Sequence, residues 1–448
     1  MKLAKEPTLP LLETLYKYAI AVLLIFIPLY PKFPLFNVPF TYVAIRAEDF
    51  FIAVTFGLLV LKLIVAKKIK LPSVSPQIGI FLFVGLVSSI SAILITKNVQ
   101  PSLVLLHYAR RIEYLVAFFL VYYAAKNSQN KKFFFELAIL PAVGVFLFGL
   151  AQIYFNAPVI STMDQEASKG VAQTLRPGVM LSSTFAGHYD LAVYLAMVMI
   201  FLAGIMSSFN DWRSRLPFLT FFSILMWLFM QAGSRISLAG LFVSVALVTL
   251  IYRRFILMIV LSAIISLGVI TTPQFITRFE SIFKVFVSQS TSVIVTPAFA
   301  QTSKVTPAPT EITPTPEPLR AIQQDRSTSI RFDVEWPRAL RSFYKNPLFG
   351  TGYSSLTLAT DNDYLRALGE TGLLGLLTFI SILVGLFKSL LHRVKKTSGL
   401  QKIVVTGSLG ILTHFLITAM FLDVFEASKV AILFWSFMGL AISITPDE

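Results

Sequence analysis

The chain has 448 residues, of which 56% are hydrophobic and only 14% are charged. Soluble domains usually carry about 25% charged residues, so this composition excludes an ordinary soluble protein. The formal net charge is +15, but the basic residues stand in short loops between apolar runs, which excludes nucleic acid as a partner, and the absence of cysteine excludes disulfides and thiolate metal sites. The sequence predicts an all-α integral membrane protein whose first partner is the lipid bilayer.

Apolar runs alternate with short polar loops along most of the chain. The first run is followed by "PLYPKFPLFNVP" rather than by a signal-peptide cleavage site, so we interpret it as a retained helix. About twenty apolar residues cross a bilayer as a helix, and somewhat fewer suffice. We therefore predict about twelve transmembrane helices, near residues 14–30, 50–66, 77–96, 110–125, 133–155, 188–206, 217–232, 235–251, 254–272, 368–391, 402–421 and 427–444.

The positive charges of the loops predict the orientation of these helices. When the N-terminus is placed in the cytoplasm, every cytoplasmic loop carries at least two basic residues, and the short outside loops carry far fewer. Both termini are then expected to be cytoplasmic. The basic residues of the cytoplasmic loops are Lys67, Lys68, Lys70, Lys126, Lys131, Lys132, Arg213, Arg215, Arg253, Arg254, Lys388, Arg393, Lys395, Lys396 and Lys402.

The chain divides into three parts on this topology. Residues 1–272 hold helices one to nine, residues 273–366 form a large external loop, and residues 367–448 hold helices ten to twelve. A Pro/Thr-rich stretch at 296–318 has the composition of an extended linker. A helical part is expected at 327–345, where Phe332, Trp336, Leu340 and Phe343 recur at helical spacing. Pro337 is expected to start or kink that helix.

Several arginines stand on the outer side, where the positive-inside rule disfavours them. They are Arg176, Arg235 and the adjacent pair Arg110 and Arg111. Ionisable groups at the edge of a span often mark a functional site, and guanidinium groups bind phosphate oxygens in a two-pronged fork. Several arginines that face one cavity would suit a diphosphate. Structural alternatives are an ion pair of Arg111 with Glu113 and a contact of Arg235 with lipid headgroups.

The stretch "TDNDYLRALGETGLLGLL" at 360–377 places charged residues directly before a membrane helix. Asp361 and Asn362 are candidate site residues here, and Asp361 also has the simpler interpretation of a helix cap. Arg366 and Glu370, and likewise Arg331 and Glu335, are four residues apart, which also fits ion pairs on a helix surface. His188, which precedes helix six, is a candidate base or an ordinary loop residue.

Four segments, in this order and topology, resemble the O-antigen ligase/polymerase superfamily of bacterial membrane glycosyltransferases. They are "RPGVMLSSTFAGHYDLAVYL", "AGSRISLAGL", "RFDVEWPRALRSFYKNPLFGTGYSS" and "DNDYLRALGETGLLGLL". The resemblance implies a C-type membrane glycosyltransferase-like fold in the bacterial cytoplasmic (inner) membrane, with the active site on the extracytoplasmic face. It also implies a donor glycan linked to polyprenyl diphosphate and a glycan, lipid-glycan or protein acceptor.

Ligases of this superfamily usually have a histidine where this chain has Asp361, and the aspartate is more similar to the polymerase branch. We therefore expect a polysaccharide (O-antigen) polymerase, with an O-antigen ligase or a protein O-oligosaccharyltransferase as alternatives. A glycan flippase or transporter is the alternative from another class, although no internal repeat supports it.

On this resemblance, each candidate residue receives an expected role in an inverting transfer. Asp361 is the expected base for the acceptor hydroxyl, with His188 as the alternative base and Asn362 holding the acceptor or the loop. Arginines are expected to stabilise the leaving diphosphate, so neither a metal nor another cofactor is expected. These are Arg176 and Arg235, with Arg110 or Arg111. Residues expected to support the loop or contact sugar are Arg331, Glu335, Tyr364 and Glu370.

Overall fold

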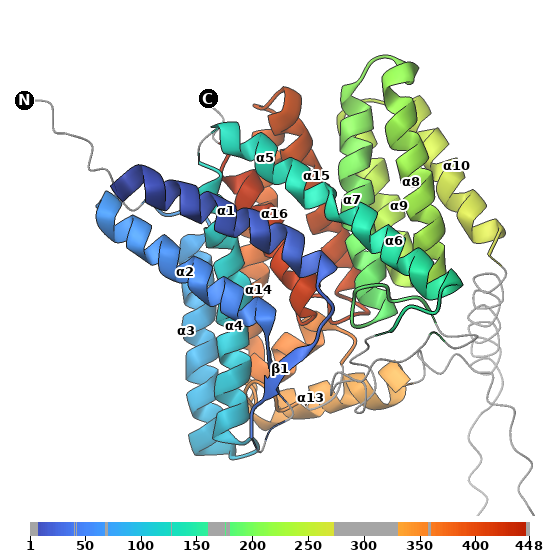
Figure 1. Ribbon diagram of the computed structural model, residues 1–448. Helices are drawn as coiled ribbons and strands as arrows, with labels where there is room; N and C mark the ends of the chain where they lie inside the picture. Colours follow the sequence, from blue (N-terminus) through green and yellow to red (C-terminus); the bar gives the residue numbers. More distant parts are fainter. Residues whose placement is uncertain are drawn as a thin grey trace, which may run out of the picture.

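The computed structural model describes residues 8–39, 41, 43–67, 70–126, 128–159, 175, 180–272, 330–356 and 360–444. Its first half contains α1 (Thr8–Leu29), β1 (Pro34–Asn37), β2 (Ala44–Arg46), α2 (Ala47–Ala66), α3 (Ser75–Ser91), the π-helix η1 (Ala92–Thr96), α4 (Pro101–Ala124), α5 (Ser128–Ile139) and α6 (Pro141–Tyr154). Its second half contains α7 (His188–Ser208), α8 (Trp212–Ala232), α9 (Arg235–Ile251), α10 (Phe255–Ile270), the π-helix η3 (Arg331–Glu335), α13 (Trp336–Lys345), α14 (Asp363–Val394), α15 (Gly399–Thr418) and α16 (Ser428–Ile442). Figure 1 shows these helices as one assembly, with α13 and β1 at its lower end and α5 at its upper end.

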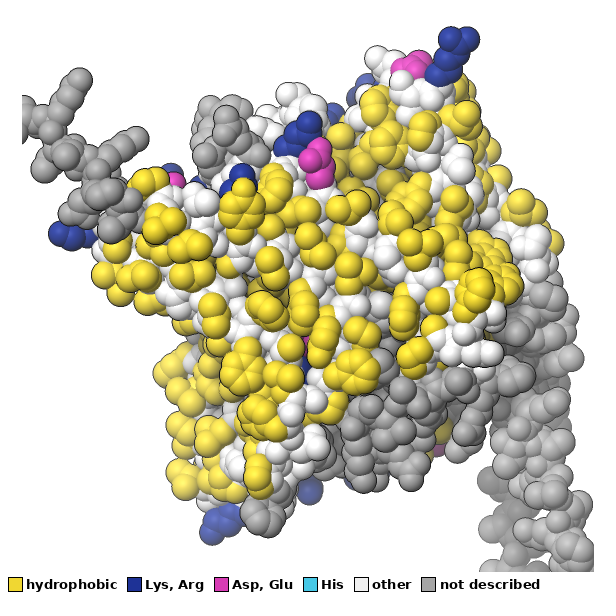
Figure 2. Space-filling view, in the orientation of Figure 1, with side chains coloured by type: hydrophobic (Ala, Val, Ile, Leu, Met, Phe, Trp, Pro, Cys, Tyr) yellow, Lys and Arg dark blue, Asp and Glu magenta, His cyan; other side chains and the backbone are white. Residues whose placement is uncertain are grey.

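Eight of the described helical segments are long and apolar enough to cross a membrane. The shorter apolar helices α9, α10 and α16 and the charged helix α4 account for the remaining predicted runs when α5 and α6 are counted together. The prediction of an all-α membrane protein is therefore confirmed. Hydrophobic side chains cover the middle of the face in Figure 2, and most of the visible charges lie toward its upper and lower margins.

The helix boundaries differ from the predicted ones where polar residues belong to a helix. The helix α4 begins at Pro101 rather than near 110, because proline is favoured at the first helical position. The helix α14 begins at Asp363 rather than near 368, because Asn362 caps it. Pro337 lies in the first turn of α13, as expected. The linker at 296–318 lies outside the described residues.

A small antiparallel hairpin between α1 and α2 was not predicted from the sequence. The strands β1 and β2 pair Pro34 with Arg46 and Asn37 with Ala44, with an irregularity between Pro34 and Phe36. The strands have only four and three residues, too short for the alternation that identifies a strand in a sequence. The hairpin places Arg46 directly at the start of α2.

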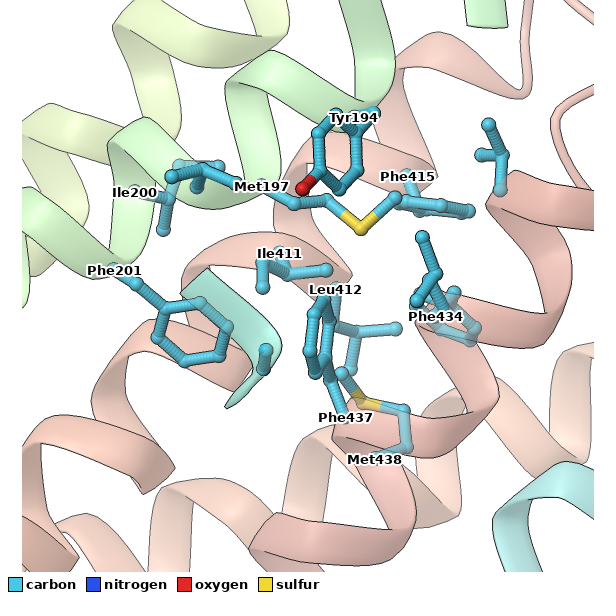
Figure 3. Close-up of a cluster of buried hydrophobic side chains, with 14 of the residues drawn as sticks. Tyr194, Met197, Ile200, Phe201, Ile411, Leu412, Phe415, Phe434, Phe437 and Met438 are labelled. Atoms are coloured by element: carbon cyan, nitrogen blue, oxygen red, sulfur yellow. The ribbon is translucent and has the colours of Figure 1, made fainter. Parts of the chain in front are cut away.

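The helices α7, α15 and α16 contribute a large part of the buried core, to which α1, α4, α8 and α9 also belong. In α7, 89% of the apolar window is buried, which makes it a central helix rather than a lipid-facing one. Tyr194, Met197 and Phe201 of α7 meet side chains of α15 and α16 in Figure 3. Helices in a membrane associate mainly through such close van der Waals packing, because lipid tails are as apolar as the side chains.

The helix α14 is interrupted at Gly372, which has φ +70° and ψ −170°. The loop after α13 satisfies the backbone groups around this break: Leu373 N donates to Pro347 O at 2.8 Å, and Gly352 N donates to Glu370 O at 2.8 Å. Non-helical backbone at membrane depth is tolerated where protein surrounds it. The bond from Gly352 N fixes the backbone of Glu370, which lies two residues before the break.

Candidate active site

A cavity of about 290 Å³ lies where α4 meets the ends of several other elements. Three basic residues line it: Lys32 after α1, Arg46 at the end of β2, and Arg110 within α4. The other lining residues are Tyr114, Ala186, Gly187, Tyr189, Asp190, Asp423, Glu426, Ala427 and Ser428. The cavity therefore collects residues from five separate stretches of the sequence.

Arg46 is held at the cavity by the local structure at the start of α2. Its backbone N–H donates to the Asp49 carboxylate at 2.9 Å in a capping box. Its guanidinium lies 3.8 Å from the Glu48 carboxylate and 3.5 Å from the Ser428 hydroxyl. Ser428 in turn donates to Glu48 at 3.1 Å, so the start of α2 is tied to the start of α16.

Lys32 lines the cavity, and the buried Lys429 follows the lining residue Ser428 in the chain. The Lys32 ammonium is 3.9 Å from the Asp190 carboxylate, and burial, followed by the nearby Arg46 charge, lowers the pKa of Lys32 to about 8. The buried Lys429 side chain donates to Thr184 O at 2.8 Å and to Tyr30 O. It thereby ties α16 to the segments that precede α2 and α7.

The adjacent arginines of α4 have different surroundings, because neighbouring residues on a helix point in different directions. Arg110 faces the cavity and donates to Ala44 O at 3.2 Å. Arg111 forms an ion pair with Glu426, lies 3.8 Å from Glu370, and stacks over the Tyr353 ring. The alternative prediction, an ion pair of Arg111 with Glu113, was wrong, because Arg111 pairs with Glu426 instead. Of the predicted pair, only Arg110 lines the cavity.

Asp361 lies beside the cavity in an ion pair with Arg331. Two guanidinium nitrogens of Arg331 contact one Asp361 oxygen, at 2.9 Å and 2.7 Å. Arg331 also interacts with Tyr189, which lines the cavity. Burial raises the pKa of Asp361; the Arg331 charge opposes this shift and the Asp423 charge adds to it. Asp361 adopts φ +49°, a left-handed conformation in which aspartate is better tolerated than most residues.

Asp423, between α15 and α16, connects this segment to the cavity. Its carboxylate accepts from Thr360 N at 2.9 Å, from Asn362 N at 3.2 Å and from the Arg366 guanidinium at 2.9 Å. Burial opposes ionisation of Asp423, but Arg366 and the hydrogen bonds outweigh it and lower its pKa. Asp423 is thus an ionised carboxylate that fixes residues 360–362 against the cavity wall.

The remaining predicted residues of this stretch make structural contacts. The Asn362 side chain caps α14 by accepting from Leu365 N at 2.9 Å and donates to Met420 O at 3.0 Å. The Tyr364 hydroxyl donates to Leu416 O at 3.0 Å. Glu370 and Arg366 form the expected pair at 3.4 Å. These contacts favour loop support over sugar contact for Asn362 and Tyr364.

Comparison with known families finds a similarity over one part of the chain. Residues 219–380 match the family described as O-antigen ligase. Over this part the chain is similar to the O-antigen ligase/polymerase superfamily. No curated protein matches the chain. The family match supports, in general terms, an enzyme of the ligase or polymerase type in a multi-pass membrane protein.

The matched part contains Arg331, Asp361 and Glu370, but the basic residues of the cavity come from elsewhere in the chain. Lys32 and Asp423 were missed by the sequence reasoning. Each is a charge in a short loop predicted to lie outside, next to an apolar run, so the signal that singled out the arginines applied to them as well.

Other predicted residues are not among those that line the cavity, or lie outside the described part. Arg176 lies outside the described residues. Arg235 begins α9, where Ser234 is the cap, and His188 begins α7 with its ring 4.0 Å from the Tyr189 ring. Neither Arg235 nor His188 is among the residues that line the cavity. Their roles in the reaction remain predictions.

Glu335 lies half-buried near the Asp361 carboxylate. Burial, followed by the charges of Asp361 and Asp423, raises its pKa to about 7.

Asp361 and Asp363 have the spacing of an Asp-x-Asp motif, but Asp363 accepts from Phe425 N at 3.1 Å, away from the Arg331 pair. In the ranges that the structure describes, no group of three or more His, Asp or Glu side chains is arranged to hold a metal ion.

Proposed function

We propose that this protein transfers a glycan from a polyprenyl diphosphate carrier to a sugar hydroxyl at the external face of the bacterial cytoplasmic membrane, as a polysaccharide polymerase. The observation that carries this proposal is the cavity that brings Lys32, Arg46 and Arg110 together beside the Asp361 segment. The family match supports the class of reaction, and the aspartate at position 361 favours the polymerase over the ligase.

The basic residues supply the donor side of the proposed reaction. A diphosphate gains negative charge as it leaves, and donors already in place stabilise this charge without reorganisation. Arg46 lines the cavity with Arg110, and its buried Nε has no hydrogen-bond partner among the described atoms. One nitrogen of the Arg110 guanidinium donates to Ala44 O, and the Arg110 side chain lines the cavity. Arg235 and Arg176 stay candidates for the same group.

Asp361 is the proposed base for the acceptor hydroxyl. A pKa raised by burial brings a carboxylate closer to the range in which it accepts a proton effectively. The ion pair with Arg331 orients the carboxylate, since two nitrogens contact one oxygen and leave the other for the acceptor. Attack from the side opposite the diphosphate would invert the anomeric centre.

The test uses purified protein, a polyprenyl-diphosphate oligosaccharide and product analysis by mass. Arg110→Gln is expected to lower kcat/KM by about 10- to 100-fold, the value of one charge-assisted contact of roughly 1.5–3 kcal/mol. Asp361→Asn is expected to lower kcat by about 100-fold or more. The matched control is Arg341→Gln, which removes an exposed guanidinium from α13 and should leave the rate unchanged.

The products distinguish the alternatives. A ladder of added repeat units supports polymerisation, and a single transfer to a lipid-linked or protein acceptor supports a ligase, which the description of the matched family favours. If wild-type protein released no carrier diphosphate from any donor yet moved the donor across vesicles, the enzyme proposal would be replaced by transport.

A further inference from the structure

A second basic cavity lies at the other end of the helix assembly. Its volume is about 350 Å³, and it is formed by α1, the end of α2, the end of α4 and the start of α5. Arg46 precedes α2 and Lys62 lies near its end, so at about 1.5 Å per residue the two cavities are roughly 24 Å apart along this helix. The two cavities therefore lie at opposite ends of α2, a helix long enough to cross a membrane.

Three lysines line this cavity against one acid, Glu13. Each ammonium group lies over an aromatic ring: Lys17 is 4.6 Å from the centroid of Phe133, Lys62 is 5.1 Å from that of Tyr16, and Lys126 is 4.7 Å from that of Tyr123. These contacts hold three flexible side chains around one volume. The cavity is thus basic before any ligand enters.

Hydrogen bonds to backbone carbonyls fix the cavity walls, and one of them runs from the Lys126 ammonium to Lys70 O at 3.5 Å. The buried Tyr16 hydroxyl donates to Leu120 O, which ties α1 to α4. The Tyr123 hydroxyl donates to Lys70 O at 3.3 Å, and Asn130 donates to Ala124 O at 3.1 Å. No salt bridge with an acidic side chain is found for Lys17, Lys62 or Lys126 within the described structure.

The surroundings of the cavity identify the source of a suitable anion. Large apolar side chains next to it on the same helices are exposed, including Leu15 of α1 (50%) and Ile64 of α2 (66%). These surfaces suit acyl chains, whereas a free phosphate would make no use of them. Figure 1 shows α1, α2 and α5 together at the upper left of the assembly, away from α13.

We propose that this cavity binds the phosphodiester headgroup of an anionic phospholipid, with Lys17, Lys62 and Lys126 contacting the phosphate and the acyl chains lying on α1 and α2. Basic pockets between membrane helices bind anionic headgroups by the same chemistry. The site is independent of the glycan-transfer reaction and stands even if that reaction is a different one.

Native mass spectrometry of the full-length protein in detergent tests the proposal. The protein is titrated with phosphatidylglycerol and, separately, with phosphatidylethanolamine of the same acyl chains. Wild-type protein is expected to prefer phosphatidylglycerol, and K17Q/K62Q/K126Q is expected to bind it roughly 100-fold more weakly, at about fivefold per lysine. The matched control K388Q/K395Q/K396Q removes three exposed lysines that lie outside the cavity and should keep the wild-type affinity.

A variant that is expected to bind the lipid more tightly distinguishes a change in binding from misfolding. Glu13→Gln removes the one acid of the cavity wall and should raise the affinity for phosphatidylglycerol by a few fold. Equal affinities for the two lipids in wild type, or equal losses in the two triple variants, would overturn the proposal. Displacement of the lipid by millimolar inorganic phosphate would also overturn it, because the site would then be a simple anion site.

Discussion

Gly350→Ala tests how the loop after α13 supports the active site. Gly350 has φ +69°, and a Cβ at this position would lie 2.5 Å from the backbone carbon and oxygen of Glu370. The left-handed conformation costs an alanine about 1–2 kcal/mol, and overpacking adds roughly 1–3 kcal/mol. Because the obstructing atoms belong to the backbone, we expect a total loss of about 2–5 kcal/mol.

The matched control is Gly399→Ala. Gly399 also has a positive φ, +53°, but no atom lies within 4 Å of its Cβ position, so this variant carries the conformational cost alone. Thermal unfolding of both variants in detergent measures the difference, which should be about 1–3 kcal/mol in favour of Gly399→Ala. Equal unfolding midpoints would refute the reasoning, since the close contact with Glu370 would then contribute nothing.

Glycan transfer by Gly350→Ala should fall further than its stability implies. The backbone of Glu370 would have to shift, and its side chain contacts Arg366 and lies 3.8 Å from Arg111. A displacement of about 1 Å near an active site lowers rates by about 100-fold. The assay is transfer at a temperature at which the variant remains folded, and a wild-type rate there would show that the loop has no influence on the site.

Two further predictions concern the residues around Asp361. Because the pKa of Glu335 is raised to about 7, its contribution to stability is complete below pH 4.5 and is lost as the pH rises toward 7. Glu335→Gln should therefore flatten the fall in unfolding temperature between pH 5 and pH 8. An unchanged profile would contradict this prediction. Asn362→Ala should cost about 1–2 kcal/mol of stability through loss of the α14 cap, and Asn362→Ser should restore most of it because serine also caps helices. Thermal unfolding checks this order, which equal midpoints for the two Asn362 variants would refute.

The helices and their membrane character were predictable because they depend on local properties. Long apolar runs, prolines at helix starts and the four-residue spacing of Arg366 and Glu370 act over one or two turns of chain, and the structure contains each of them. The Asn362 cap was not predicted, because Asp361 beside it is an equally good capping residue. Only the backbone geometry, with Asp361 at φ +49°, distinguishes the two.

The partners of the charged residues were decided by the tertiary structure. Arg111 pairs with Glu426 and Arg331 with Asp361, although each has an acid nearby in the sequence. A guanidinium that is removed from water needs its partner at contact distance and in the right direction, and helix packing sets both. The sequence by itself determined that the chain forms membrane helices with charges at their ends. Which of these charges share a cavity was determined only by packing, because residues 32, 46, 110 and 423 come from four separate stretches of the chain.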